Sequence, residues 1–322
     1  MKEIDILDID GIKIGNAQNL EAGTGCTVII CEKGCTAGVD VRGGGPASHE
    51  TELLNPINTV DKIYGVCLSG GSAYGLEASS GVMKYLEEKG IGFKVGEIVV
   101  PIVCGASIFD LAVGDFKIRP DKKMGYEACI NSEKNIVEEG NVGAGTGASV
   151  GKYRGIERAM KSGLGVYAVQ VGNLKVGAVV SVNAVGDVID VGTNKTIAGL
   201  LNEEKTKILS TREEIWNDFE NQGGKFTGNT TIACLITNAK LTKSEATKIA
   251  GMTHNGFARA ICPVHTALDG DTIFTMGTGE VESNVNTLGT LGAYVMAKAI
   301  NKAVLKTEGR YGLISSKDLK NK

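Results

Sequence analysis

The sequence predicts a mixed α/β or α+β fold in which helices cover sheets. Apolar runs of strand length alternate loosely with longer stretches whose apolar residues recur at helical spacing. Glycine supplies 45 of the 322 residues, about twice its usual share, and it gathers in clusters between the apolar segments. Such clusters are typical of a sheet-rich enzyme with many close backbone approaches. A chain of this length can bury a large core, in one large domain or two small ones.

Strands dominate the prediction for the first 70 residues. The segment 4–42 reads as short strands separated by turns, with clear apolar runs at 26–31 and 37–41. The run Arg-Gly-Gly-Gly-Pro at 42–46 has no strand-forming residues and is predicted to be a loop. A further short strand is expected at 66–68.

The turn at 69–72 precedes apolar residues at helical spacing. We therefore predict a helix that begins after this turn, is capped by Ser72 and ends at Gly90. Another apolar strand and a turn are predicted within 98–120, and a glycine-rich loop at 141–152.

Strands of the second half share continuous apolar runs, at 165–171, 175–185, 231–237 and 273–276. Two helices are predicted with them, one from a capping box at Thr242 to about Ala260 and one at 285–305. The charged and glycine-containing stretch 202–228 is predicted to be exposed and mobile.

Composition excludes several classes of function. The net charge of −3 predicts no binding of nucleic acid or of an anionic membrane surface, and the longest apolar runs are too short to span a bilayer. The N-terminus lacks the pattern of a signal peptide, so we expect a cytoplasmic protein. Most of the eight cysteines lie in apolar or glycine-rich surroundings and are expected to be small core residues. The cluster Cys26, Cys31 and Cys35 fits no zinc spacing, so no metal is expected.

Two other chemistries fit the sequence poorly. The glycine loop at 141–152 resembles a phosphate-binding loop, but Thr146 and Tyr153 occupy positions where that motif needs glycine and Ser/Thr. Of only three histidines, His49, His254 and His265, none accompanies a Gly-x-Ser-x-Gly elbow. His254 lies within the capped helix and is interpreted as a packing or surface residue.

The junction Asn229-Thr230 can carry a different chemistry. Taken alone, it is a polar turn before a buried strand. A threonine hydroxyl at such a position can also attack the preceding carbonyl and exchange the amide for an ester. Hydrolysis of the ester then frees an N-terminal threonine, whose amine has an ordinary pKa of about 7.7–8.0 and can serve as a general base. A chain with few histidines can run acyl transfer in this way.

Several motifs in the same order resemble one family over nearly the whole chain. They lie at 42–46, 68–78, 182–187, 229–232 and 268–271. The sequence resembles the P1 family of self-cleaving peptidases, which includes L-aminopeptidase/D-esterases, β-aminopeptidases and 6-aminohexanoate-oligomer hydrolases. The resemblance implies a self-processing amide hydrolase that acts on small peptides, amino-acid amides or amide oligomers.

The resemblance also assigns residues. Thr230 is the expected nucleophile, freed by cleavage after Asn229, and Asn183 is expected to donate its side-chain amide to the oxyanion. Asp269 and Asp271 are expected to reach the Thr230 amine and hydroxyl, since an i, i+2 pair in an extended segment shares one face. Lys152 completes the expected cluster. Taken alone, Asn183, the Asp269–Asp271 pair and Lys152 are better explained as a strand end, a turn and a solvated lysine, but together with the Asn-Thr junction they favour the catalytic interpretation.

One position departs from the family, which often has tyrosine where this chain has Phe109, so Phe109 is a candidate for the substrate pocket. The resemblance implies an αββα sandwich shared with ornithine acetyltransferase. It also implies one domain, 1–322, cut into a 1–229 part and a 230–322 part. A homo-oligomer, often a tetramer, is expected, without metal or organic cofactor. Two alternatives stay open, an acyltransferase of the same fold and an unprocessed relative without enzymatic activity.

Overall fold

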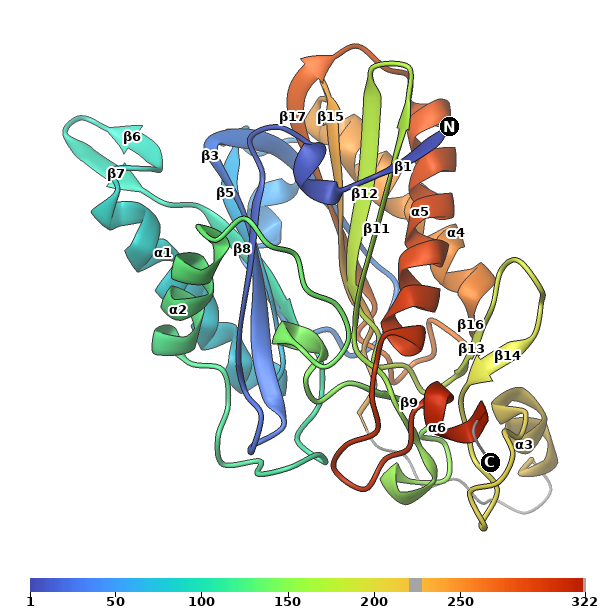
Figure 1. Cartoon of the computed structure of the whole chain (residues 1–322). Helices are drawn as coiled ribbons and strands as arrows, with labels where there is room; N and C mark the ends of the chain where they lie inside the picture. Colours follow the sequence, from blue (N-terminus) through green and yellow to red (C-terminus); the bar gives the residue numbers. More distant parts are fainter. Residues whose placement is uncertain (220–227, 321–322) are drawn as a thin grey trace.

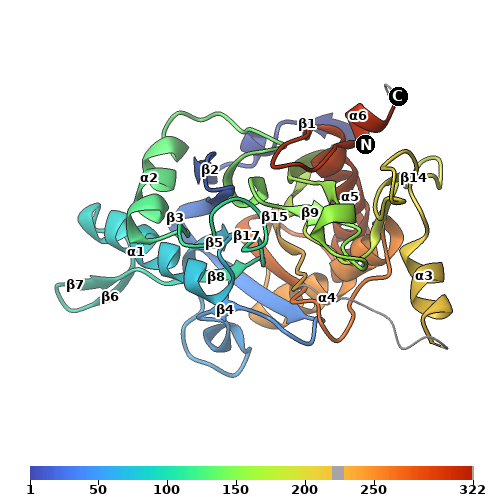
Figure 2. The ribbon, with the colours of Figure 1, turned by 90° about the horizontal axis from the view of Figure 1, so that it is seen from below.

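A computed structural model of the protein describes residues 1–219 and 228–320. In it, two β-sheets lie face to face between two pairs of helices (Figure 1). Seen from below, α1 and α2 cover one side and α4 and α5 cover the other, with the strands between them (Figure 2). This is the αββα sandwich that the resemblance implied. The helices are α1 (Ala78–Glu88), α2 (Lys122–Ser132), α3 (Thr211–Asn217), α4 (Lys243–Ala260), α5 (Val285–Leu305) and α6 (Ser316–Lys320).

The two sheets share one long strand, β3 (Thr24–Val41). Its second half pairs with β17, and its first half pairs with β2 and β5. The first sheet runs in the order β1 (Lys2–Ile4), β11 (Leu164–Val171), β12 (Leu174–Ser181), β15 (Ile232–Ala239), β17 (Thr272–Val281) and β3. The second consists of β2 (Lys13–Asn19), β3, β5 (Ile63–Ser69), β8 (Val103–Ser107) and β4 (Ser48–His49).

Two short strand pairs and one three-stranded sheet are separate from the two main sheets. They are β6 (Phe93–Val95) with β7 (Ile98–Val100), β9 (Ser149–Val150) with β10 (Met160–Lys161), and β13 (Asp187–Ile189) with β14 (Thr196–Ala198) and β16 (Ile261–Cys262).

Alternation of side chains along the strands creates three apolar layers. On β12, Ala178 and Val180 belong to the layer under α4 and α5, whereas Val179 between them faces the second sheet. The middle layer joins residues of both sheets, such as Phe274 of β17 and Leu68 of β5. The third layer lies under α1 and α2. Strands buried on both faces read as continuous apolar runs, which explains why the sequence showed them so clearly.

Three predictions of element boundaries need correction. The runs expected as separate strands at 26–31 and 37–41 belong to one continuous strand, β3. Ser72 does not cap α1 with its side chain: it has φ 54° and begins a 3-10 turn, Ser72–Glu77, that runs into the helix. The preceding turn is held instead by the Asp110 carboxylate, which accepts a hydrogen bond from Gly71 N at 2.6 Å. The strand predicted at 175–185 ends at Ser181, because the chain leaves the sheet there.

The charged stretch 202–228 contains a helix that periodicity did not predict. Ser210 caps α3 by accepting a hydrogen bond from Glu213 N, and the buried Thr211 donates to the Asp187 carboxylate. Arg154 bridges to Glu214 and Asp218, so this helix is fastened to the body of the molecule. Residues 202–219 are mostly exposed or half-buried, as predicted, while residues 220–227, with their two glycines, lie outside the described part.

The cysteines and His254 occupy the places expected of packing residues. Seven of the eight cysteines are buried as free thiols, and Cys262 is half-buried. His254 is fully buried within α4. Over the described residues, no helix is both long and apolar enough to cross a membrane, and no group of three or more potential metal ligands comes together.

Candidate active site

The topology brings four loop segments together at one end of the first sheet. β12 runs antiparallel to β15, so the chain after Ser181 meets the chain before Ile232. β17 runs parallel to β15, which places Asp269 and Gly270 beside Asn229. β3 runs antiparallel to β17, so the glycine loop after Val41 arrives there as well. Residues far apart in sequence therefore surround the Asn229-Thr230 junction.

The hydroxyl of Thr230 lies against the carbonyl group that precedes it. Thr230 Oγ1 donates a hydrogen bond to Asn229 O, and Gly270 N donates to the same oxygen at 3.1 Å. Thr230 is 4% exposed, and its amide N–H donates to Asn183 O at 3.0 Å. The Asn229 carbonyl oxygen thus accepts from two donors, the neighbouring Thr230 hydroxyl and the Gly270 N–H. The Gly270 N–H lies where it can stabilise negative charge on that oxygen.

Glycine is required at position 270. A Cβ atom there would lie 2.8 Å from Thr230 Oγ1 and 2.8 Å from Gly45 O, inside the normal contact distance of both. The glycine loop packs equally closely, because a Cβ on Gly43 would lie 2.2 Å from Asp269 O. Gly45 N donates to that same oxygen at 2.8 Å. The Arg-Gly-Gly-Gly-Pro motif therefore serves as a backbone brace for the segment that carries both aspartates.

Lys152 is a buried amine next to the junction. Its Nζ donates to Asn183 O at 2.9 Å and to Gly228 O at 3.4 Å. Burial lowers the pKa of Lys152 to about 7, although the negative charges of Asp269, Asp110 and Asp271 oppose this shift. Lys152 Nζ and Thr230 N share the oxygen of Asn183 as an acceptor, so the amine is a neighbour of the nitrogen that cleavage would release.

The two aspartates have different surroundings. Asp269 Oδ2 accepts from Thr266 N at 2.8 Å and from Thr266 Oγ1 at 2.6 Å, while its Oδ1 is buried without a hydrogen-bond partner among the described residues. Burial, followed by the charge of Asp271, raises the pKa of Asp269. Asp271 Oδ1 accepts from Thr231 N at 2.8 Å, and its Oδ2 accepts from His265.

Asn183 and Phe109 contact each other beside the junction. The Nδ2 of Asn183 donates to Phe109 O at 2.9 Å, and its Oδ1 accepts from Ser149 N in the glycine-rich loop at 3.1 Å. The backbone oxygen of Asn183, rather than its amide, therefore faces Thr230 in the uncut chain. The Phe109 ring packs on Gly228, where a Cβ would lie 2.7 Å from the ring.

All five residues expected from the resemblance thus gather around one peptide bond, directly or through one intermediate group. Sequence reasoning did not identify Gly270 N or His265 as part of the site. Gly270 lies between Asp269 and Asp271 in the motif at 268–271, but a backbone donor leaves no side-chain signal in the sequence. His265 lies six residues before Asp271, and only the turn between them brings the two together.

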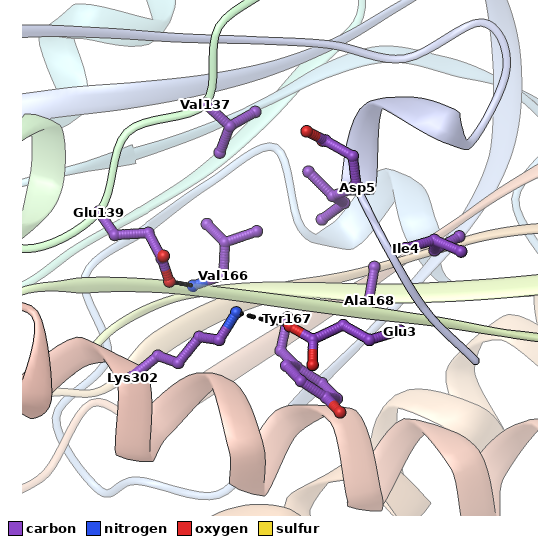
Figure 3. A pocket seen from close by; sticks show the side chains of 10 residues that line it. Glu3, Ile4, Asp5, Val137, Glu139, Val166, Tyr167, Ala168 and Lys302 are labelled. Atoms are coloured by element: carbon purple, nitrogen blue, oxygen red, sulfur yellow. Dashed lines mark hydrogen bonds and ion pairs between the residues drawn. The ribbon is translucent and has the colours of Figure 1, made fainter. Parts of the chain in front are cut away.

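A cavity of about 370 Å³ lies elsewhere, between the N-terminal strand, β11 and α5 (Figure 3). Its charged lining is already engaged, since Lys302 pairs with Glu3 at 3.0 Å and Glu139 accepts from Val166 N at 2.9 Å. None of the five expected site residues lines it.

The known proteins that this chain resembles are peptidases and amide hydrolases. The model of the family described as "Peptidase family S58" matches residues 5–314. An uncharacterized aminopeptidase of Mycobacterium leprae is 38% identical, with 96% of this chain and 92% of that protein covered. A 6-aminohexanoate-oligomer endohydrolase of Agromyces is 30% identical over 94% of this chain and 86% of its own. The solved L-aminopeptidase D-Ala-esterase/amidase of Ochrobactrum anthropi shares the fold, with a TM-score of 0.71 at 17% identity, over 96% of this chain and 89% of its own.

Proposed function

The chain belongs to peptidase family S58 and is a hydrolase of amide or peptide bonds, and from this premise we propose that it cuts itself between Asn229 and Thr230. The released Thr230 then serves as its nucleophile. The observation that carries this proposal is the Thr230 hydroxyl hydrogen-bonded to the Asn229 carbonyl, whose oxygen is also held by Gly270 N. A single domain then consists of the parts 1–229 and 230–322.

Self-cleavage begins with a bond between Thr230 Oγ1 and the carbonyl carbon of Asn229. The hydroxyl proton passes to Lys152, whose pKa of about 7 leaves much of it as a free amine at neutral pH. The same proton is returned to the Thr230 nitrogen as the carbon–nitrogen bond breaks, which gives an ester. Water then adds to the ester, leaving a carboxylate on Asn229 and a free amine and hydroxyl on Thr230. Gly270 N–H stabilises the oxyanion in both steps.

The same groups support hydrolysis of a substrate. The new Thr230 amine keeps Asn183 O as its acceptor. It also has in its neighbourhood the Oδ1 of Asp269, which has no hydrogen-bond partner in the described part of the chain. The amine takes the proton of its own hydroxyl as the hydroxyl attacks the substrate carbonyl, and it passes that proton to the substrate nitrogen as the amide bond breaks and the amine leaves. Water then hydrolyses the ester, which releases the acid and restores the Thr230 hydroxyl. Asn183 becomes a second oxyanion donor only when its Nδ2 leaves Phe109 O, so we assign that donation to the processed enzyme.

The substrate class is proposed from the relatives. We propose short peptides, amino-acid amides or linear amide oligomers, with Phe109 beside the substrate. The named activities of the relatives, aminopeptidase and amide-oligomer hydrolase, share one reaction, attack on a secondary amide.

Intact mass and N-terminal sequencing of the purified chain test the proposal. Two fragments, one beginning Thr230-Thr231-Ile232, are expected, together with release of product from amide substrates. A chain that stays uncut after long incubation contradicts it. Adding an amino acid as acceptor separates hydrolysis from acyl transfer, because a transferase gives an acylated acceptor instead of a free acid.

We also propose that the protomers self-associate, a tetramer being the expected state. The β6–β7 hairpin projects from the body of the molecule and exposes Phe93, Val95, Ile98 and Val100 (Figure 1). Among the described strands β6 and β7 pair only with each other, and an isolated two-stranded hairpin is marginal in water, so we expect a second copy to cover it. Ile98→Lys is expected to lower the molar mass found by light scattering, and a monomeric wild-type chain contradicts the proposal.

A further inference from the structure

Both carboxylates of the site are held by two consecutive residues, His265 and Thr266. Thr266 holds Asp269 through its backbone N–H and its hydroxyl. His265 holds Asp271 in the same manner, through its backbone N–H at 3.1 Å and its ring Nδ1 at 2.9 Å, both on Oδ2. Since Oδ2 is a carboxylate oxygen, Nδ1 carries the proton and donates.

The backbone at His265 is what allows this double contact. His265 has φ 57°, in the left-handed region that residues other than glycine seldom adopt. This conformation turns its N–H and its side chain towards the same oxygen. Unusual backbone conformations of this kind cluster at functional sites because the surrounding contacts enforce them.

The ring is fixed by its neighbours, and no hydrogen bond joins it to Thr230 within the described residues. His265 stacks on Phe257 with ring centroids 6.0 Å apart and meets His254 edge-on at 4.8 Å. Its Nε2 is buried without a hydrogen-bond partner among the described residues. Its only hydrogen-bonded side-chain partner in the described structure is Asp271.

Asp271, whose position is fixed by His265, in turn fixes the backbone next to the nucleophile. With Oδ2 held by His265, Oδ1 accepts from Thr231 N at 2.8 Å, directly after Thr230. Both oxygens of Asp271 are therefore occupied, whereas Asp269 keeps one oxygen without a partner among the described residues.

We propose that His265 is a positioning residue of the amide hydrolase site, which fixes Thr230 through Asp271 and the Thr231 amide. The inference rests on the proposed function. The two carboxylates then have different roles. Asp271 orients Thr230, and Asp269 interacts with the amine that cleavage releases.

The variants His265→Asn and His265→Asp test this division as a matched pair. Asn and Asp are nearly the same size, both tolerate the left-handed backbone, and both lose the ring contacts with Phe257 and His254. The Nδ2 of asparagine is bonded to Cγ, as Nδ1 of histidine is, so it replaces the lost donor. Aspartate instead presents an oxygen to the Asp271 carboxylate, which drives the two apart.

The full-length chains are compared by the rate of self-processing and, for processed protein, by kcat and KM. We expect His265→Asn to process within about threefold of the wild type, and His265→Asp to be slowed about 10- to 100-fold, the range for losing a hydrogen bond to a charged group. The loss is expected in kcat with little change in KM, because the nucleophile and not the substrate pocket is displaced. If His265→Asp does not fold, His265→Gly, which removes the donor without adding a charge, takes its place.

The outcomes distinguish the role of His265 from the proposed self-processing. If the wild type processes itself but the Asn and Asp variants behave alike, the ring acts only by packing and the role of His265 is overturned while the proposed function stands. A wild-type chain that never processes overturns the proposed function, and the positioning role with it.

Discussion

The Nζ of Lys152 lies 2.9 Å from the carbonyl oxygen of Asn183, the same atom that accepts the amide N–H of Thr230 at 3.0 Å. One backbone oxygen therefore orients both the amine and the nitrogen that leaves during cleavage. Burial disfavours the charged form of a lysine in this place, and the lowered pKa makes Lys152 a base near neutral pH.

Self-processing is expected to quicken as the pH rises through about 7, where Lys152 loses its proton. Below that pH the ammonium form cannot take the hydroxyl proton. Lys152→Met removes the titrating group, so its processing is expected to be slow and to lack this rise. Mass spectrometry checks this by measuring how fast the fragment beginning at Thr230 appears across pH 5–9, about two units on either side of the Lys152 pKa. A wild-type rate that is flat over the range argues against Lys152 as the base.

Thr230 can be tested by a pair of variants. Thr230→Ser keeps the hydroxyl and is expected to cut, while Thr230→Ala has no nucleophile and is expected to stay whole and inactive. Intact mass after prolonged incubation distinguishes them. Cleavage of Thr230→Ala at the same bond would show that the hydroxyl is not the attacking group.

The strands and long helices could be predicted from the sequence because burial dictates their apolar patterns. β15 is buried along its whole length, and α4 begins at the capping box around Thr242 that its sequence displays. The prediction failed at Ser72 because the turn there is set by Asp110, which is distant in sequence, and not by a local cap. Local patterns carry no record of such a distant partner.

The site was predicted from motifs, while its internal connections came only from the fold. Nothing in the chain near Asn183 shows that its carbonyl, and not its amide, faces Thr230. The pairing of His265 with Asp271 depends on the turn between them and on a left-handed backbone. Interactions of this kind are three-dimensional and have no periodic signal.

Gly270→Ala is expected to block or strongly slow self-processing. The added Cβ would lie 2.8 Å from Thr230 Oγ1, so the hydroxyl or the Gly270 N–H must move away from the Asn229 carbonyl. Loss of one oxyanion donor typically costs about 10²–10³ in rate. Gly192→Ala is a matched control, since its Cβ would meet only Asp190 Oδ1 at an ordinary 3.4 Å. Equal processing by both variants would remove Gly270 from the proposed mechanism.

Lys161 gives a prediction on stability that is independent of the cleavage. Its side chain is fully buried and its Nζ donates to Gly145 O at 3.1 Å and Ala148 O at 2.9 Å, which braces the glycine-rich loop. Burial lowers the pKa of Lys161 to about 7 in the folded chain, against 10.5 for an ordinary lysine. Between these two pH values the unfolded chain binds a proton that the folded chain lacks, so the free energy of unfolding rises with pH across this window.

The slope contributed by Lys161 is at most about 1.4 kcal/mol per pH unit, and Lys152 adds a similar one. Urea unfolding of the uncut Thr230→Ala chain at several pH values from about 7 to 10 measures the sum. Lys161→Met removes one of the two contributions, so its unfolding free energy is expected to depend less steeply on pH, even though the freed carbonyls of the loop lower its stability overall. An unchanged slope in Lys161→Met would mean that Lys161 keeps its proton in the folded chain, and that the glycine-rich loop is braced by an ammonium group across the whole range.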